Sequence, residues 1–152
     1  MTKAKSKSHK KECEHFIFEI KEWEPDYTFS VNLRGDKPGN YSEYVQIKLE
    51  ATCIEPKKCA GAACHFTLSS RRHYFPAEAK ILTLNEREKW LGELRLSPKG
   101  GSYYGPIPHE STAAIVSALS SKRLACVVLR GAPLYRGSSW CQSIDLAAGW
   151  EQ

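Results

Sequence analysis

The chain has 152 residues, of which 26% are charged and 41% hydrophobic, and a formal net charge of +5. This composition and length suit a single globular domain with a sizeable core. The charge is unevenly placed: residues 1–12 hold five lysines and one glutamate, a net charge of +4, which leaves +1 for residues 13–152. The nearly neutral remainder gives no support to a nucleic-acid-binding surface on the folded part.

The sequence contains neither a membrane-spanning apolar run nor a stretch of the signal-peptide kind, and both bear on the compartment. No run approaches the ~18 consecutive apolar residues that cross a bilayer, and no apolar stretch of the signal-peptide kind follows the basic N-terminus. We therefore expect a soluble, cytoplasmic protein with no membrane partner. In a reducing compartment its six cysteines should remain thiols, and buried thiols usually serve as small apolar side chains.

Residues 1–14 are rich in lysine and serine and contain almost nothing apolar. Such a segment cannot bury enough surface to offset its ordering entropy, so we expect a disordered tail followed by one domain over residues 15–149. The tail suits either a solubilising role or weak contact with a polyanion. Its candidate polyanion-binding residues are Lys3, Lys5, Lys7, Lys10 and Lys11.

Alternation of apolar and polar residues predicts several β-strands in the first half of the chain. Residues 15–23 and 27–33 should form a hairpin across a turn at residues 24–26, because proline and aspartate favour turns. Residues 44–53 predict a third strand, and residues 64–68 predict its antiparallel partner. Each of these strands should bury one face and expose the other.

One principal helix is predicted over about residues 109–121, from an apolar stripe and an acidic residue in its first turn. A short second helix is predicted near residues 86–91. Residues 124–130 predict a buried strand, and residues 139–147 predict a final strand with Trp140, Ile144 and Leu146 on one face. Because strands outnumber helices and no βαβ repeat occurs, we expect an α+β domain: a mainly antiparallel β-sheet with the principal helix packed on it.

The strongest candidate binding site is the glycine-rich loop at residues 99–111, which precedes the principal helix. Glycines let the backbone approach a ligand closely, and a helix N-terminus attracts anions. The loop lacks the Gly-Lys-Ser/Thr ending of a P-loop and the G-x-G-x-x-G pattern of dinucleotide sites. Its candidate ligand-binding residues are Lys99, Gly100, Gly101, Tyr103, Tyr104, His109 and Ser111.

A weaker candidate is a zinc site formed by Cys53, Cys59 and Cys64. The spacing C-x5-C-x4-C-H contains none of the tight ligand pairs typical of structural zinc sites. Strand alternation also places Cys53 and Cys64 in the core and turns His65 away from Cys64. We therefore expect two core cysteines, one loop cysteine (Cys59) and no cofactor, with zinc binding as the alternative.

No motif completes a catalytic constellation. Cys141, Ser143 and Asp145 share one predicted strand face that His109 can approach, but nothing in the sequence indicates a lowered thiol pKa. Whether the chain is an enzyme is left undecided. We expect a small non-catalytic binding or interaction domain with a protein or polyanion partner. The alternatives are an enzyme or anion-binding protein that uses residues 99–111, and a zinc-binding module.

Overall fold

The structure is a computed structural model that describes residues 13–34, 37–74, 79–80 and 90–150. Its strands are β1 (Glu14–Arg34), β2 (Lys37–Glu55), β3 (Ala63–Tyr74), β4 (Ala79–Lys80), β5 (Gly92–Ser97), β6 (Gly100–Pro106), β7 (Cys126–Gly131) and β8 (Ser138–Ala147). Its helical elements are α1 (Thr112–Ser120) and two 3-10 turns, Lys57–Cys59 and His109–Ser111.

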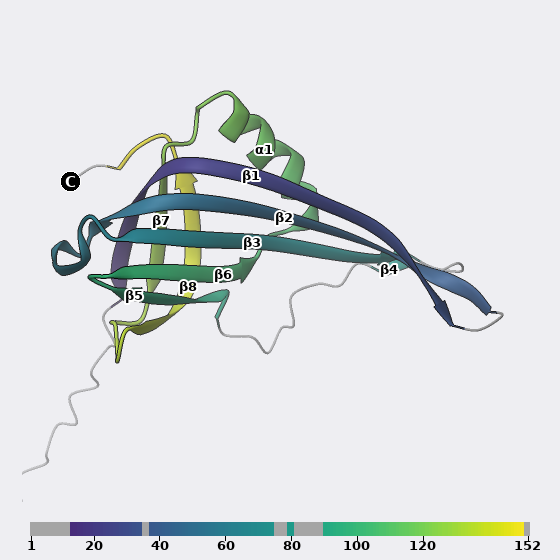
Figure 1. Ribbon diagram of the computed structural model, residues 1–152, viewed down its shortest axis with the longest axis horizontal. Coiled ribbons are helices and arrows are strands. Elements are labelled where there is room, and N and C mark those ends of the chain that lie inside the picture. Colours follow the sequence, from purple (N-terminus) through teal and green to yellow (C-terminus); the bar gives the residue numbers. More distant parts are fainter. Residues whose placement is uncertain (1–12, 35–36, 75–78, 81–89, 151–152) are drawn as a thin grey trace, which may run out of the picture.

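Seven strands close into a barrel in the order β1-β2-β3-β6-β5-β8-β7, and β7 pairs again with β1 (Figure 1). Closure is visible at Ile17, which lies opposite Glu55 of β2 and also opposite Val128 of β7. All barrel neighbours are antiparallel except β3 and β6, which are parallel. Strands make up 65% of the structure and helices 13%, so the predicted α+β fold with an open sheet is wrong.

The principal helix forms close to where it was predicted, but it does not cover a sheet. After the 3-10 turn, α1 packs against the barrel core through buried Leu119 and half-buried Ile115 and Val116 (Figure 1). The second helix, predicted near residues 86–91, falls mainly outside the described residues. Its last two positions, Trp90 and Leu91, are not helical.

The predicted turn at residues 24–26 is also wrong, because β1 runs through it without a break. Pro25 lies opposite Ile47 of β2 in an uninterrupted antiparallel ladder. The pairing of β1 with β7 extends only to Glu19, so Pro25 faces no strand of the described barrel on its other side. Proline is tolerated at such an edge because its missing N–H leaves no ladder partner unsatisfied. The long β1–β2 hairpin therefore projects beyond the barrel (Figure 1).

The barrel interior is filled by the alternate residues of its strands. The prediction for residues 44–53 and 64–68 is confirmed, since Ile47, Leu49, Phe66 and Leu68 are all buried and the two segments pair antiparallel. Phe18 meets Phe66 edge to face, with ring centroids 4.9 Å apart. Each such side chain contributes about 1.5–3 kcal/mol to folding through burial.

Tyr103 points into the barrel and lies against two glycines. A Cβ atom at Gly105 would lie 2.4 Å from the Tyr103 hydroxyl oxygen, and one at Gly92 would lie 2.7 Å from it. Both positions therefore need glycine to leave room for the ring. The hydroxyl is buried with no hydrogen-bond partner among the described residues, and burial raises its pKa.

Candidate functional site

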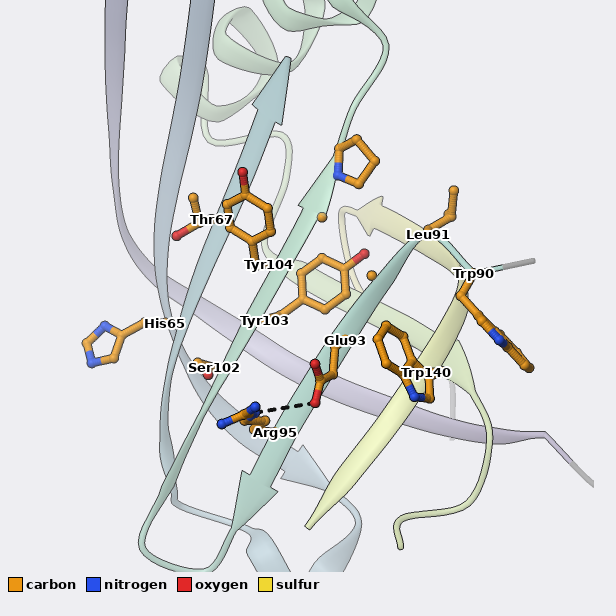
Figure 2. A pocket seen from close by; sticks show the side chains of 13 residues that line it. His65, Thr67, Trp90, Leu91, Glu93, Arg95, Ser102, Tyr103, Tyr104 and Trp140 are labelled. Atoms are coloured by element: carbon orange, nitrogen blue, oxygen red, sulfur yellow. Dashed lines mark hydrogen bonds and ion pairs between the residues drawn. The ribbon is translucent and has the colours of Figure 1, made fainter. Parts of the chain in front are cut away.

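A cleft of about 770 Å³ lies on the outer wall of the barrel, over β3, β6, β5 and β8 (Figure 2). Three aromatic rings line it and remain well exposed: 37% for Trp90, 59% for Tyr104 and 50% for Trp140. Its charged lining residues are Glu93 and Arg95. The volume falls within the range of about 300–1,000 Å³ that is usual for ligand sites.

The strand register brings these side chains together. Tyr104 of β6 lies opposite Glu93 of β5, and Glu93 in turn lies opposite Trp140 of β8. Side chains directly opposite each other on neighbouring strands have Cβ atoms about 4.5–5.5 Å apart. Glu93 therefore has an aromatic residue opposite it on each adjacent strand; Figure 2 shows the Trp140 ring beside Glu93, whereas the Tyr104 ring leans away from it towards Thr67.

Trp140 reaches the cleft because of a β-bulge. The pairing of β7 with β8 shifts register between Arg130 and Gly131, which lie opposite Ser143 and Cys141, so Gln142 is the extra residue. A bulge changes which face the following residues occupy. Trp140 is thus exposed, whereas Ile144 and Leu146 pack against the core. The prediction that Trp140, Ile144 and Leu146 share one face is wrong for this reason.

Glu93 is held as a carboxylate at the centre of the cleft. It accepts hydrogen bonds from Ser138 Oγ at 2.8 Å and from Arg95 Nε at 3.3 Å. The Ser138 hydrogen bond and then the Arg95 charge lower the pKa of Glu93 below its usual range. Tyr104 is positioned by Ser69, whose Oγ donates to the Tyr104 hydroxyl at 3.3 Å. The cleft therefore presents an ionised carboxylate beside the Trp140 ring and, towards β3, the exposed ring of Tyr104.

A second cleft of about 330 Å³ adjoins the first and shares His65 and Thr67 with it. It is lined by Glu22, Glu24 and Glu50, with Lys48 as its one lysine. Glu22 and Glu50 lie directly opposite each other on β1 and β2. Like charges in that position repel, so a bound cation would relieve the repulsion.

The residues predicted to form a glycine-rich binding loop do not come together. Gly100 and Gly101 begin strand β6 instead of forming a loop, and Lys99 lies in the turn before it. A Cβ at Gly101 would lie 2.5 Å from the Arg95 carbonyl oxygen, so this glycine serves strand packing and leaves no room for a ligand. The side chains of Tyr103 and Tyr104 point to opposite faces of β6.

The other end of the predicted loop forms a separate hydrogen-bonded network. His109 Nδ1 lies 3.0 Å from Ser70 Oγ, and His109 Nε2 contacts the carboxylate of Glu43. Glu43 also accepts a hydrogen bond from the Tyr27 hydroxyl at 2.9 Å. Ser70 is only 6% exposed and belongs to neither cleft, so we interpret this network as a link between the 3-10 turn and strands β1, β2 and β3. The remaining predicted residue, Ser111, makes no capping hydrogen bond at α1.

The buried cysteines Cys53, Cys64 and Cys141 do not offer reactive thiolates. Cys53, Cys59 and Cys64 are all buried; Cys59 ends the 3-10 turn between β2 and β3, so it lies in a loop as predicted, but its side chain packs in the core. Burial, followed by the neighbouring thiols, raises the pKa of Cys53 to about 12 and that of Cys64 to about 11. Burial also raises the pKa of Cys141 to about 11. Within the described ranges, no three His, Cys, Asp or Glu residues converge in a way that would hold a metal ion.

Sequence reasoning selected Tyr104 and Tyr103 but missed the residues that complete the cleft, namely Trp90, Glu93, Arg95 and Trp140. The predicted tail lysines lie outside the described residues. No helix in the described part of the chain has the length and hydropathy needed to span a membrane. Comparisons with protein-family models, with curated proteins and with solved structures found no match to this chain.

Proposed function

We propose that this chain is a non-catalytic binding domain that recognises organic cations of the ammonium or guanidinium type. The observation that carries the proposal is the row Tyr104–Glu93–Trp140, in which three adjacent strands place an ionised carboxylate in one cleft with two exposed aromatic rings. Aromatic faces attract a cation by about 0.5–2 kcal/mol each, and the carboxylate supplies the opposite charge. Trp90 adds a third ring to the same cleft.

The surrounding charges favour a cation over an anion. An anion in the first cleft would meet Glu93, and the adjoining cleft adds Glu22, Glu24 and Glu50. Arg95 is the cationic residue of the first cleft, but its side chain is 74% exposed and already bonded to Glu93. An incoming cation can therefore replace Arg95 beside the Glu93 carboxylate, and the arginine side chain then stays in water.

The test is a titration with tetramethylammonium chloride, followed by two-dimensional NMR of the backbone amides and Trp indoles, against sodium chloride at equal ionic strength. We expect saturable shifts at Trp140 and Tyr104 with the organic cation alone. Trp140→Ala should weaken binding by about 2- to 30-fold, which corresponds to the loss of 0.5–2 kcal/mol. Glu93→Gln should weaken it as well.

Tyr135→Ala is the matched control, because Tyr135 is 70% exposed and lines neither cleft. Its affinity should equal that of the unaltered protein. Shifts that sodium reproduces, or an equal loss of affinity in Tyr135→Ala and Trp140→Ala, would show that the cleft does not recognise organic cations.

A further inference from the structure

The lysine-rich tail enters the fold beside the cleft. Cys13, the first described residue, contacts the side chain of Gln142, with its Sγ atom 3.7 Å from Gln142 Oε1. Gln142 lies two residues after Trp140 in β8, and both side chains are exposed on the outer wall. Residues 1–12 are therefore tethered to the outer wall of the barrel, next to the larger cleft.

The tether is short enough for the lysines to reach the carboxylates. From β1, Glu93 is three strands away through β7 and β8, or about 14 Å at ~4.8 Å per strand. Lys10 precedes Cys13 by three residues, which span up to about 10 Å, and its side chain adds roughly 6 Å. Lys3 is ten residues away and can span up to about 33 Å. That reach also includes Glu50, which lies opposite Glu22 on the neighbouring strand, nine residues along β1 from Cys13 or about 30 Å at ~3.3 Å per residue.

The charges of the two partners are opposite. The tail carries five lysines and one glutamate. The two clefts contain Glu22, Glu24, Glu50 and Glu93, against Lys48 and Arg95. Both clefts are open and adjoin each other on the outer wall. One extended segment can therefore place several cationic side chains in them at once.

We propose that the tail lysines of this same chain occupy the two clefts and compete with external cations. This inference rests on the proposed function, since it uses the same sites. A short tether gives the tail an effective concentration in the millimolar range. If the tail alone binds with a dissociation constant of about 0.1–1 mM, an external cation is bound roughly 2- to 10-fold more weakly than by empty clefts. The tail is then an internal competitor that an external ligand must displace.

The experiment compares three full-length proteins in the same tetramethylammonium titration. The first is unaltered; in the second, Lys3, Lys5, Lys7, Lys10 and Lys11 are all changed to Gln; in the third, all five are changed to Arg. We expect the Gln protein to bind tetramethylammonium about 2- to 10-fold more tightly than the unaltered protein. The Arg protein, which keeps the positive charge of the tail, should bind tetramethylammonium with the same affinity as the unaltered protein.

A second measurement separates the two proposals. Without any ligand, the Trp140 indole and Glu93 amide signals should differ between the Gln protein and the unaltered protein, because the tail leaves the clefts. If the Gln protein shows neither this difference nor tighter binding while tetramethylammonium still binds, the tail proposal is overturned and the proposed function stands. If the signals differ but no protein binds tetramethylammonium, the tail occupies the clefts and the recognition of external cations is refuted.

Discussion

Replacing Gly105 by alanine tests how tightly the barrel is packed beneath the cleft. The new Cβ atom would lie 2.4 Å from the Tyr103 hydroxyl oxygen and 2.8 Å from the ring carbon that bears it. The ring cannot move aside, because Tyr103 is 2% exposed and Gly92 lies against the same hydroxyl. Overpacking of this kind costs about 1–3 kcal/mol.

The cost should depend on Tyr103. Tyr103→Phe removes the atom that makes the closest contact, and it also removes a buried hydroxyl that has no hydrogen-bond partner among the described residues. By itself it should leave the free energy of unfolding unchanged or raise it, since an unsatisfied buried hydroxyl costs about 1–3 kcal/mol. Combined with Gly105→Ala, it should recover part of the loss, with a coupling energy of about 0.5–3 kcal/mol.

Urea unfolding followed by tryptophan fluorescence measures all of these free energies. For Gly105→Ala we expect the midpoint to fall by roughly 0.5–1.5 M, from the predicted loss and a typical denaturant dependence. Gly149→Ala is the matched control, because a Cβ at Gly149 meets nothing within 4 Å. A Gly105→Ala protein as stable as the control, or a double variant whose loss is the sum of the single losses, would refute the packing argument.

Three further predictions concern the thiols and His109. A thiol reagent at pH 8 should modify Cys13 in the native protein and the buried cysteines only after unfolding, because burial raises the pKa of Cys53 to about 12 and that of Cys64 to about 11. Since unfolded thiols ionise near pH 8.5, the free energy of unfolding should fall as pH rises from about 8.5 towards 11, and a rise would contradict this. His109→Ala should destabilise the protein by about 1–3 kcal/mol in urea unfolding, because it removes a hydrogen-bond partner of Glu43; an unchanged midpoint would show that the network is dispensable.

Local patterns predicted the elements that pack by simple alternation and failed where the fold is decided at longer range. The pairing of residues 44–53 with residues 64–68 is confirmed because each segment has one apolar face and the two are close in sequence. Barrel closure depends on β1 pairing with β7, more than a hundred residues later, which no local pattern encodes. Pro25 suggested a turn, but proline is also tolerated in a strand whose edge is open. The edge of β1 is open at Pro25 because the pairing of β1 with β7 ends at Glu19.

The cleft shows the same limit at the level of single side chains. Tyr104, Glu93 and Trp140 become neighbours only because β5 pairs with β6 on one side and with β8 on the other. The alternation rule placed Trp140 on the same face as Ile144 and Leu146, and a single extra residue, Gln142, puts them on opposite faces. In the sequence a bulge appears only as a change of phase in the hydrophobic alternation, which here falls between Cys141 and Ile144. Within the glycine-rich stretch, Gly105 is required by the ring of Tyr103 beneath the cleft, a packing role that the sequence pattern does not reveal.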